Sequence, residues 1–101
     1  MVTRKNWVAG LRSGKYQQGK FRLRNKDKYC CLGVACDIND SSQWEKMPNS
    51  PVYLYEGCTD ILPDELRNLL NLALSEATIL TSMNDSGADF NEIADYIEGL
   101  S

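Results

Sequence analysis

The chain contains 101 residues, of which 43% are hydrophobic and nine are aromatic. This length is typical of one domain (residues 1–101) with a single core, and it leaves little room for a deep enclosed active site. The apolar fraction excludes a disordered chain, and no apolar run is long enough to cross a membrane. The sequence begins without the apolar stretch of a signal peptide, so we expect a cytoplasmic protein whose four cysteines are reduced thiols.

The charge is distributed very unevenly along the sequence. The first 28 residues hold nine lysines or arginines against one acid, and the last 42 residues hold one arginine against nine acids. Two interpretations remain open, because the two ends can fold against each other and neutralise, or the basic third can face an anionic ligand. Aromatic residues interleave with the basic ones, as they do in nucleotide-binding surfaces: Trp7, Tyr16, Phe21 and Tyr29.

The N-terminal third predicts a helix followed by a β-hairpin. The helix is expected over residues 3–11, with Thr3 as its N-cap and Gly14 beyond its end. After a polar connection, residues 21–24 alternate apolar and basic side chains, which predicts a half-buried strand with Phe21 on its buried face. Residues 29–32 are expected to return as the antiparallel partner strand after a turn over 25–28.

The longest nearly uncharged run of the sequence, residues 29–38, is predicted to form the centre of the core. It contains three of the four cysteines, which behave as small buried hydrophobes when they are not oxidised. From Gly33 onward its periodicity predicts a helix that ends near residues 39–42. Residues 39–51 lack any periodicity and are expected to be a loose connection, and Val52–Tyr55 predicts a third strand.

The C-terminal part predicts three helices. Pro63 is suited to the first turn of one helix, and a second carries Ala77 and Leu80 before it breaks at residues 84–87. The last helix has Asp89 as its N-cap and Glu92 in a capping box. The sequence therefore predicts an α+β fold, in which four to five helices pack on a three-stranded antiparallel sheet around one core.

Several kinds of chemistry are disfavoured by the residues present. The sequence contains no histidine, which removes the usual general base at neutral pH and the most common metal ligand. The spacings of the four cysteines do not match a structural zinc site. We therefore expect neither an enzyme nor a resident metal or cofactor.

The segment Asn84-Asp85-Ser86-Gly87 has the composition of an oxygen-rich loop but not the spacing of an EF-hand. It is interpreted as a turn between two helices, where Asn, Asp and Gly serve local backbone conformations. The helix that follows is acidic and has no recognition helix after it, which argues against duplex DNA as a partner.

The sequence resembles a family of small, largely uncharacterised proteins found in bacteriophage genomes and in some bacteria. The shared pattern extends over most of the chain, and its cysteine-rich block is the most specific part. The residues that carry it are Trp7, Leu11-Arg12-Ser13-Gly14-Lys15-Tyr16-Gln17-Gln18-Gly19, Leu23-Arg24, Tyr29-Cys30-Cys31-Leu32-Gly33-Val34, Cys36-Asp37, Met83-Asn84-Asp85-Ser86-Gly87, Phe90 and Ile93-Ala94-Asp95-Tyr96-Ile97-Glu98.

This resemblance implies a phage-type accessory protein, located in the host cytoplasm, rather than a particular reaction. We expect a non-catalytic binding protein that antagonises a host factor by capturing a nucleotide-like anion, with Tyr16 or Trp7 stacking on the base. The alternative is a direct inhibitor of a host protein that uses the acidic C-terminal helices. The sequence leaves open whether the chain forms a homo-oligomer. The candidate ligand-binding residues are Arg12, Tyr16, Gln18, Arg22, Arg24, Asn84 and Asp85.

Overall fold

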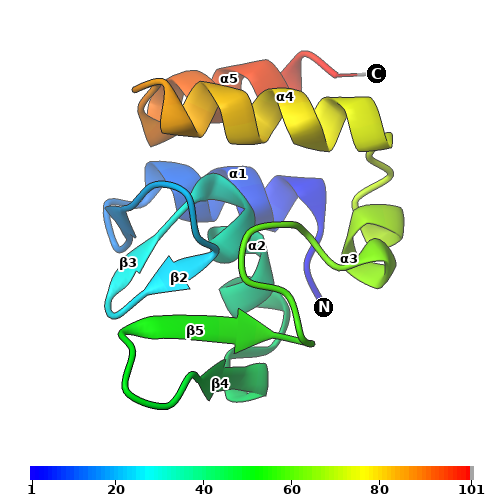
Figure 1. Ribbon diagram of the computed structural model, residues 1–101. Coiled ribbons are helices and arrows are strands. Elements are labelled where there is room, and N and C mark those ends of the chain that lie inside the picture. Colours follow the sequence, from blue (N-terminus) through cyan, green and yellow to red (C-terminus); the bar gives the residue numbers. More distant parts are fainter. Residues whose placement is uncertain (101) are drawn as a thin grey trace.

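Helix α2 lies at the centre of the computed structural model, which describes residues 1–100, with helices on one side of it and a sheet of short strands on the other (Figure 1). The α+β class predicted from the sequence is confirmed. The elements in chain order are α1 (Arg4–Arg12), β1 (Gln17–Gln18), β2 (Arg24–Asn25), β3 (Lys28–Tyr29), α2 (Cys31–Asp40), the 3-10 turn η1 (Ser41–Gln43), β4 (Trp44–Lys46), β5 (Val52–Tyr55), α3 (Asp64–Leu69), α4 (Leu74–Asp85) and α5 (Phe90–Glu98).

The cysteine-rich run forms the buried start of α2. All side chains from Cys31 to Cys36 are buried, which confirms that this run is central to the core. The prediction that residues 29–32 form a strand is wrong beyond Tyr29, because Cys30 is already the N-cap of the helix. Its sulfur accepts a hydrogen bond from the backbone N–H of Gly33 at 3.4 Å, which helps to start the helix two residues before Gly33.

The sheet has five strands in the order β1-β3-β2-β5-β4. The prediction of a three-stranded antiparallel sheet therefore gave too few strands. The β1–β3 pair is parallel and the other three pairs are antiparallel, which makes the sheet mixed. The additional strands, β1 and β4, are two and three residues long and show no readable alternation. Strand β4 lies within the region that was expected to be a loose connection.

Phe21 does not occupy the buried strand position that its sequence context predicts. Its φ angle is 70°, in the left-handed region, and its side chain is 64% exposed, whereas Leu23 is fully buried. The backbone N–H of Phe21 donates to the carboxylate of Asp85 at 3.0 Å, and that of Leu23 donates to the carbonyl of Thr59 at 2.6 Å. These contacts hold the chain outside the ladder, and strand β2 begins only at Arg24.

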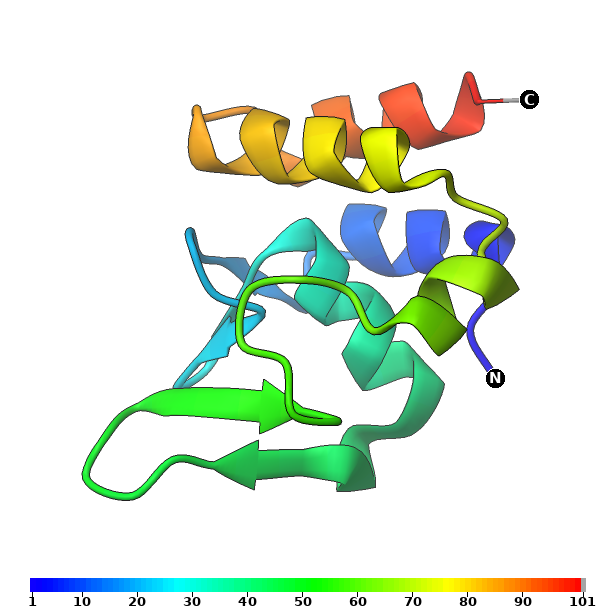
Figure 2. The same cartoon turned by 45° about the vertical axis from the view of Figure 1, so that its right-hand side comes forward.

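The first and last helices pack against each other, although they lie at opposite ends of the described chain (Figures 1 and 2). The predicted capping box of Asp89 and Glu92 is present before α5, and Thr3 is the N-cap of α1 as predicted. In α1 the side chain of Asn6 completes a capping box that was not predicted. Among residues 1–100, no helix is long and apolar enough to cross a membrane.

Candidate functional site

Three of the predicted site residues, Gln18, Asn84 and Asp85, meet in one buried joint. The side chain of Asn84 is fully buried, and its oxygen accepts hydrogen bonds from the backbone N–H of Cys31 (3.1 Å) and the amide of Gln18 (2.9 Å). Its amide nitrogen donates to the carbonyl of Gly19 at 2.8 Å. These bonds join the end of α4 to the start of α2 and to β1, so Asn84 has a structural role.

Asp85 and Gln18 complete this joint from its two sides. Asp85 accepts hydrogen bonds from the backbone of Phe21 (3.0 Å) and from Asn84 (3.4 Å). Gln18 also donates to the carbonyl of Ala88 at 2.8 Å. The fold therefore brings these three predicted site residues together, and they form hydrogen bonds with one another and with the backbone of the chain.

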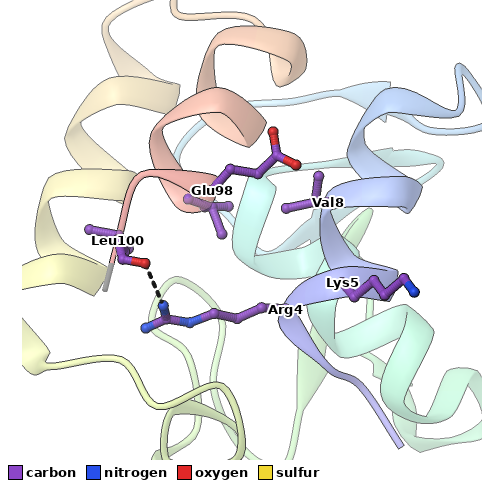
Figure 3. A pocket seen from close by; sticks show the side chains of 6 residues that line it. Arg4, Lys5, Val8, Glu98 and Leu100 are labelled. Carbon is purple, nitrogen blue, oxygen red and sulfur yellow. Dashed lines mark hydrogen bonds between the residues drawn. The ribbon is translucent and has the colours of Figure 1, made fainter.

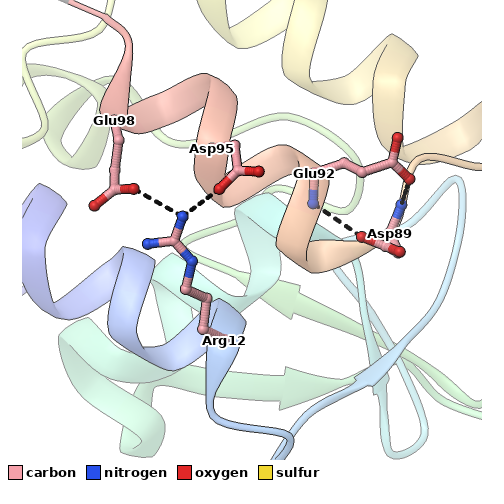
Figure 4. A network of polar contacts seen from close by, with 5 residues as sticks. All are labelled: Arg12, Asp89, Glu92, Asp95 and Glu98. Atoms are coloured by element: carbon pink, nitrogen blue, oxygen red, sulfur yellow. Dashed lines mark hydrogen bonds and ion pairs between the residues drawn. The ribbon is translucent and has the colours of Figure 1, made fainter.

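Arg12 lies in a different place, between α1 and α5 (Figure 4). Its guanidinium forms ion pairs with Asp95 and with Glu98, the second at 2.7 Å. The hydrogen bond from Arg12 lowers the pKa of Glu98, and the two carboxylates raise the pKa of Arg12. At this contact the basic and acidic ends of the chain do neutralise each other.

The two aromatic residues that were expected to stack on a base both form hydrogen bonds within the chain. Trp7 is fully buried, and its indole N–H donates to the carbonyl of Cys31 at 2.8 Å, so the prediction that it stacks on a ligand is wrong. Tyr16 is half-buried and donates to the carboxylate of Asp37 at 2.7 Å. Burial is the main cause that raises the pKa of Tyr16, and this hydrogen bond raises the pKa further. Trp44 donates to the other oxygen of Asp37 at 3.0 Å.

Arg24 is a half-buried predicted site residue that forms no ion pair within residues 1–100. It belongs to a row of directly paired residues that crosses the sheet from β3 to β4, namely Tyr29, Arg24, Tyr53 and Lys46. Directly paired residues project from the same face of a sheet, so aromatic and cationic side chains alternate along this row. The guanidinium carbon of Arg24 lies 3.8 Å from the ring centroid of Tyr53 and 5.3 Å from that of Tyr29.

This stacking leaves the edge of the guanidinium available. The Nε of Arg24 donates to the carbonyl of Lys26 at 2.8 Å, while stacking on the ring faces places no demand on its terminal N–H groups. A guanidinium held in this way can donate two parallel hydrogen bonds to a phosphate or carboxylate. The local geometry thus fixes the orientation of Arg24 in advance.

A hollow of about 390 Å³ adjoins this row where the two hairpin turns meet. The turn after β2 contacts the turn before β5, because the backbone N–H of Lys26 donates to the carbonyl of Pro51 at 2.7 Å. The hollow is lined by Lys26, Lys46, Asn49, Ser50, Pro51 and Tyr53. We call Arg24, Lys26, Lys46 and Tyr53 the hairpin-tip site.

The hairpin-tip site carries an excess of positive charge. Within residues 1–100, ion pairs form only at Arg12 and Arg67, so its three cations have no carboxylate partner in this part of the chain. Lys26 and Lys46 are exposed. Glu45 neighbours Lys46 in the sequence, but alternation along β4 places it on the opposite face of the sheet. The arrangement can therefore attract and hold a small anion.

Arg22 does not join Arg24 in a common binding site. It is exposed, donates to the carbonyl of Phe21 at 3.1 Å, and lines a separate hollow together with Asp85. The expected alternation of residues 21–24 would have placed both arginines on one face. That alternation is broken, because β2 begins only at Arg24.

Another hollow, of about 270 Å³, lies between the start of α1 and the end of α5 (Figure 3). Arg4 borders it and donates to the carbonyls of Leu70 (2.7 Å), Asn71 (2.6 Å) and Leu100 (3.3 Å). Because its guanidinium donates to three backbone carbonyls, Arg4 links α1 to the segments around Leu70 and Leu100. We therefore interpret it as a structural residue and not as a ligand-binding cation.

The cysteines do not form a reactive or metal-binding centre in the described part of the chain. No cluster of three or more potential metal ligands occurs in residues 1–100, and all four thiols are free. Burial raises the pKa of Cys30 to about 11 and also raises the pKa values of Cys31 and Cys36. A thiol with a raised pKa is a poor nucleophile at neutral pH.

Sequence reasoning found Arg24 but missed Lys26, Lys46 and Tyr53. Lys46 and Tyr53 lie on either side of the segment Met47-Pro48-Asn49-Ser50-Pro51, whose two prolines and Asn-Ser pair are typical of a turn. Interpreting that segment as a hairpin turn would have paired Lys46 with Tyr53 across β4 and β5.

Comparison with curated proteins and with solved structures finds no significant match. A family described as a domain of unknown function (DUF8296) matches residues 2–101, which is nearly the whole chain. The protein therefore belongs to this family.

Proposed function

We propose that this protein is a non-catalytic binding protein that captures a phosphate-bearing, nucleotide-like anion at the hairpin-tip site. The observation that carries the proposal is the guanidinium of Arg24, stacked 3.8 Å from the Tyr53 ring centroid and flanked by two unpaired lysines. A cation that is oriented in advance loses less conformational entropy on binding than a free side chain does.

Each residue of the site has a chemical role in this proposal. Arg24 binds two phosphate oxygens through its terminal N–H groups, and Lys26 and Lys46 contribute positive charge from the two turns. The face of the Tyr53 ring that Arg24 does not cover supplies the aromatic surface for the base, in place of Trp7, which is fully buried, and Tyr16, which is half-buried. The half-open hollow beside these residues is large enough for a phosphate and part of a nucleoside.

The biological role that we propose is host antagonism of the phage type, as the resemblance of the sequence implies. A binding protein of this kind acts stoichiometrically, and it can lower the free concentration of a nucleotide signal by sequestering it. The alternative, direct inhibition of a host protein through the acidic helices, is weakened at α5, because Arg12 neutralises Asp95 and Glu98 there.

Isothermal titration and thermal shift with ATP, ADP-ribose and cyclic dinucleotides, at low and physiological salt, would test this function. A ligand at a hundredfold its Kd should stabilise the fold by about 2.7 kcal/mol, and the effect should weaken as salt increases. The double variant Lys26→Ala/Lys46→Ala should lose at least tenfold in affinity. The matched control Lys20→Ala removes an exposed charge outside the site and should bind as the wild type does.

Two results would contradict the proposal. One is a panel in which no nucleotide shifts the melting temperature under either salt condition. The other is binding that Lys26→Ala/Lys46→Ala leaves unchanged, because the ligand would then occupy another surface.

A further inference from the structure

Tyr53 separates the cations of the hairpin-tip site into two groups. The guanidinium carbon of Arg24 lies 3.8 Å from the ring centroid of Tyr53 and so covers one face of the ring. Tyr53 lines the hollow of about 390 Å³ together with Lys26 and Lys46, whereas Arg24 does not line it. The ring therefore stands between Arg24 on one side and the two lysines on the other.

The pairing of the strands produces the same separation in the backbone. Arg24 pairs with Tyr53 across β2 and β5, and Tyr53 pairs with Lys46 across β5 and β4. Because neighbouring strands lie about 4.8 Å apart, Arg24 and Lys46 are roughly 10 Å apart across the sheet, with Tyr53 midway. A ligand that uses both cations therefore has to extend past the ring of Tyr53.

The thickness of the ring determines which ligands can do this. A group that packs on the free face lies about 3.5–4.0 Å from the ring, and is therefore about 7 Å or more from the guanidinium carbon of Arg24 on the opposite face. The adjacent phosphates of ADP or ATP share a bridging oxygen and lie too close together to reach both sides of the ring. Phosphates on the 3′ and 5′ carbons of one ribose are separated by the sugar and can lie on either side of it.

The hollow contains donors for one of these phosphates. Lys26 and Lys46 supply positive charge on its rim. The hydroxyl of Ser50, which also lines the hollow, accepts a hydrogen bond from the backbone N–H of Val52 at 3.1 Å, so its own O–H can donate to an anion. The hollow thus suits a phosphate without a contribution from Arg24.

The backbone of Lys26 supports a role for its side chain. Lys26 is the first of the two residues that connect β2 to β3, and its φ angle of 58° is one that Gly or Asn adopts more readily. Its N–H donates to the carbonyl of Pro51 at 2.7 Å, which holds the turn beside the hollow. A lysine in a conformation that favours asparagine is expected where the charge of its side chain is used.

We propose that the hairpin-tip site selects nucleotides that carry two phosphates separated by a ribose, as in a nucleoside 3′,5′-bisphosphate. One phosphate accepts hydrogen bonds from the terminal N–H groups of Arg24, and the other lies in the hollow with Lys26 and Lys46. The base packs on the free face of Tyr53. This inference rests on the proposed function and names the class of ligand for the same site.

Isothermal titration at constant ionic strength with AMP, ATP and adenosine 3′,5′-bisphosphate would test this selectivity. ATP carries at least as much charge as the bisphosphate but has adjacent phosphates, so it controls for nonspecific attraction. The bisphosphate should bind at least tenfold more tightly than either. A tetranucleotide of adenosine carries the same phosphate spacing inside a chain. Tighter binding of it than of the bisphosphate would assign this chemistry to single-stranded nucleic acid, and equal or weaker binding would assign it to a free nucleotide.

Two variants each remove one half of the site. Arg24→Gln removes the guanidinium, and Lys26→Asn/Lys46→Ala removes both charges at the hollow while Asn preserves the left-handed turn. In each variant the bisphosphate should bind no more tightly than AMP, because one phosphate has lost its partner. Lys26→Asn alone should retain or raise the melting temperature. Arg22→Gln is the matched control, since it removes an exposed arginine outside the site and should keep the full preference for the bisphosphate.

The outcomes separate this inference from the proposed function. Equal affinity for the bisphosphate and for AMP or ATP, lost for all of them in Lys26→Asn/Lys46→Ala, would overturn the two-phosphate selectivity and leave the proposed function standing. A preference for the bisphosphate that persists in Arg24→Gln would also overturn it, because Arg24 would then not hold the second phosphate. Absence of binding by all three nucleotides would overturn both.

Discussion

Gly33 explains why the cysteine-rich block needs a glycine inside a helix. A Cβ atom at this position would lie 1.8 Å from the carbonyl oxygen of Leu23, which is backbone and cannot rotate away. The same carbonyl accepts a hydrogen bond from the N–H of Cys30 at 3.2 Å. The missing side chain therefore lets the segment before β2 cross directly over the first turn of α2.

Gly33→Ala should destabilise the protein strongly. Alanine improves helix propensity by about 1 kcal/mol, but the backbone clash should cost about 3 kcal/mol or more, so the clash decides the sign. Urea unfolding midpoints would measure this loss. Gly10→Ala in α1 is the matched control, since its Cβ would come too close only to the end of the Ile38 side chain, which can move. Equal midpoints for the two variants would contradict the explanation.

At the scale of elements, the contact between α1 and α5 links the two oppositely charged ends of the chain. The ion pairs of Arg12 with Asp95 and Glu98 lie at its surface and are therefore screened by solvent. The hydrophobic faces of the two helices, with Trp7 and Ile97 among their buried residues, supply most of the stability. The ion pairs therefore contribute less to the stability of this contact than the hydrophobic packing does.

The stability contributed by Glu98 should depend on pH. Its folded pKa lies below the ordinary value of 4.5, so its contribution is fully present above that value and is lost as the pH falls through the folded pKa. Thermal melts of Arg12→Ala and Glu98→Gln should lack this small acid-dependent loss. A wild-type profile between pH 5 and 3 that matches both variants would refute a role for the pair.

Local signals in the sequence predict the helices well, but not the sheet. Thr3 and Asp89 are caps that lie beside the helices they start, and the apolar periodicity of α5 is complete within nine residues. Strand β1, in contrast, has two residues and acquires its identity only by pairing with β3. Phe21 is held out of the sheet by Asp85, 64 residues away, and no local pattern records that contact.

The candidate site was predictable to the same limited extent. The basic and aromatic composition of the first third indicated anion binding, and Arg24 was identified within it. Its stacking partner Tyr53 and its neighbour Lys46 come from a different hairpin, and only the register of β2, β5 and β4 brings them together. Asn84 was singled out for its polarity, yet the fold uses that polarity inside the core.

At the scale of the whole molecule, three of the four thiols report on global unfolding. Cys30, Cys31 and Cys36 are buried in the centre of the core, while Cys58 is partly exposed. Iodoacetamide under native conditions should label Cys58 slowly, because burial also raises its pKa, and should label the other three only as the whole domain opens. In concentrated urea all four should react, and rapid native labelling of Cys36 would contradict this arrangement.

The packing of α1 against α5 also determines when the domain can fold during its synthesis. Helix α1 leaves the ribosome before α5, so its apolar face lacks the helix that is synthesised roughly 86 residues later. At translation rates of about 5–20 residues per second, this delay is roughly 4–17 s. During that time Trp7, Val8 and Leu11 lack their final partner, so the nascent chain should be a substrate for chaperones and proteases until α5 emerges.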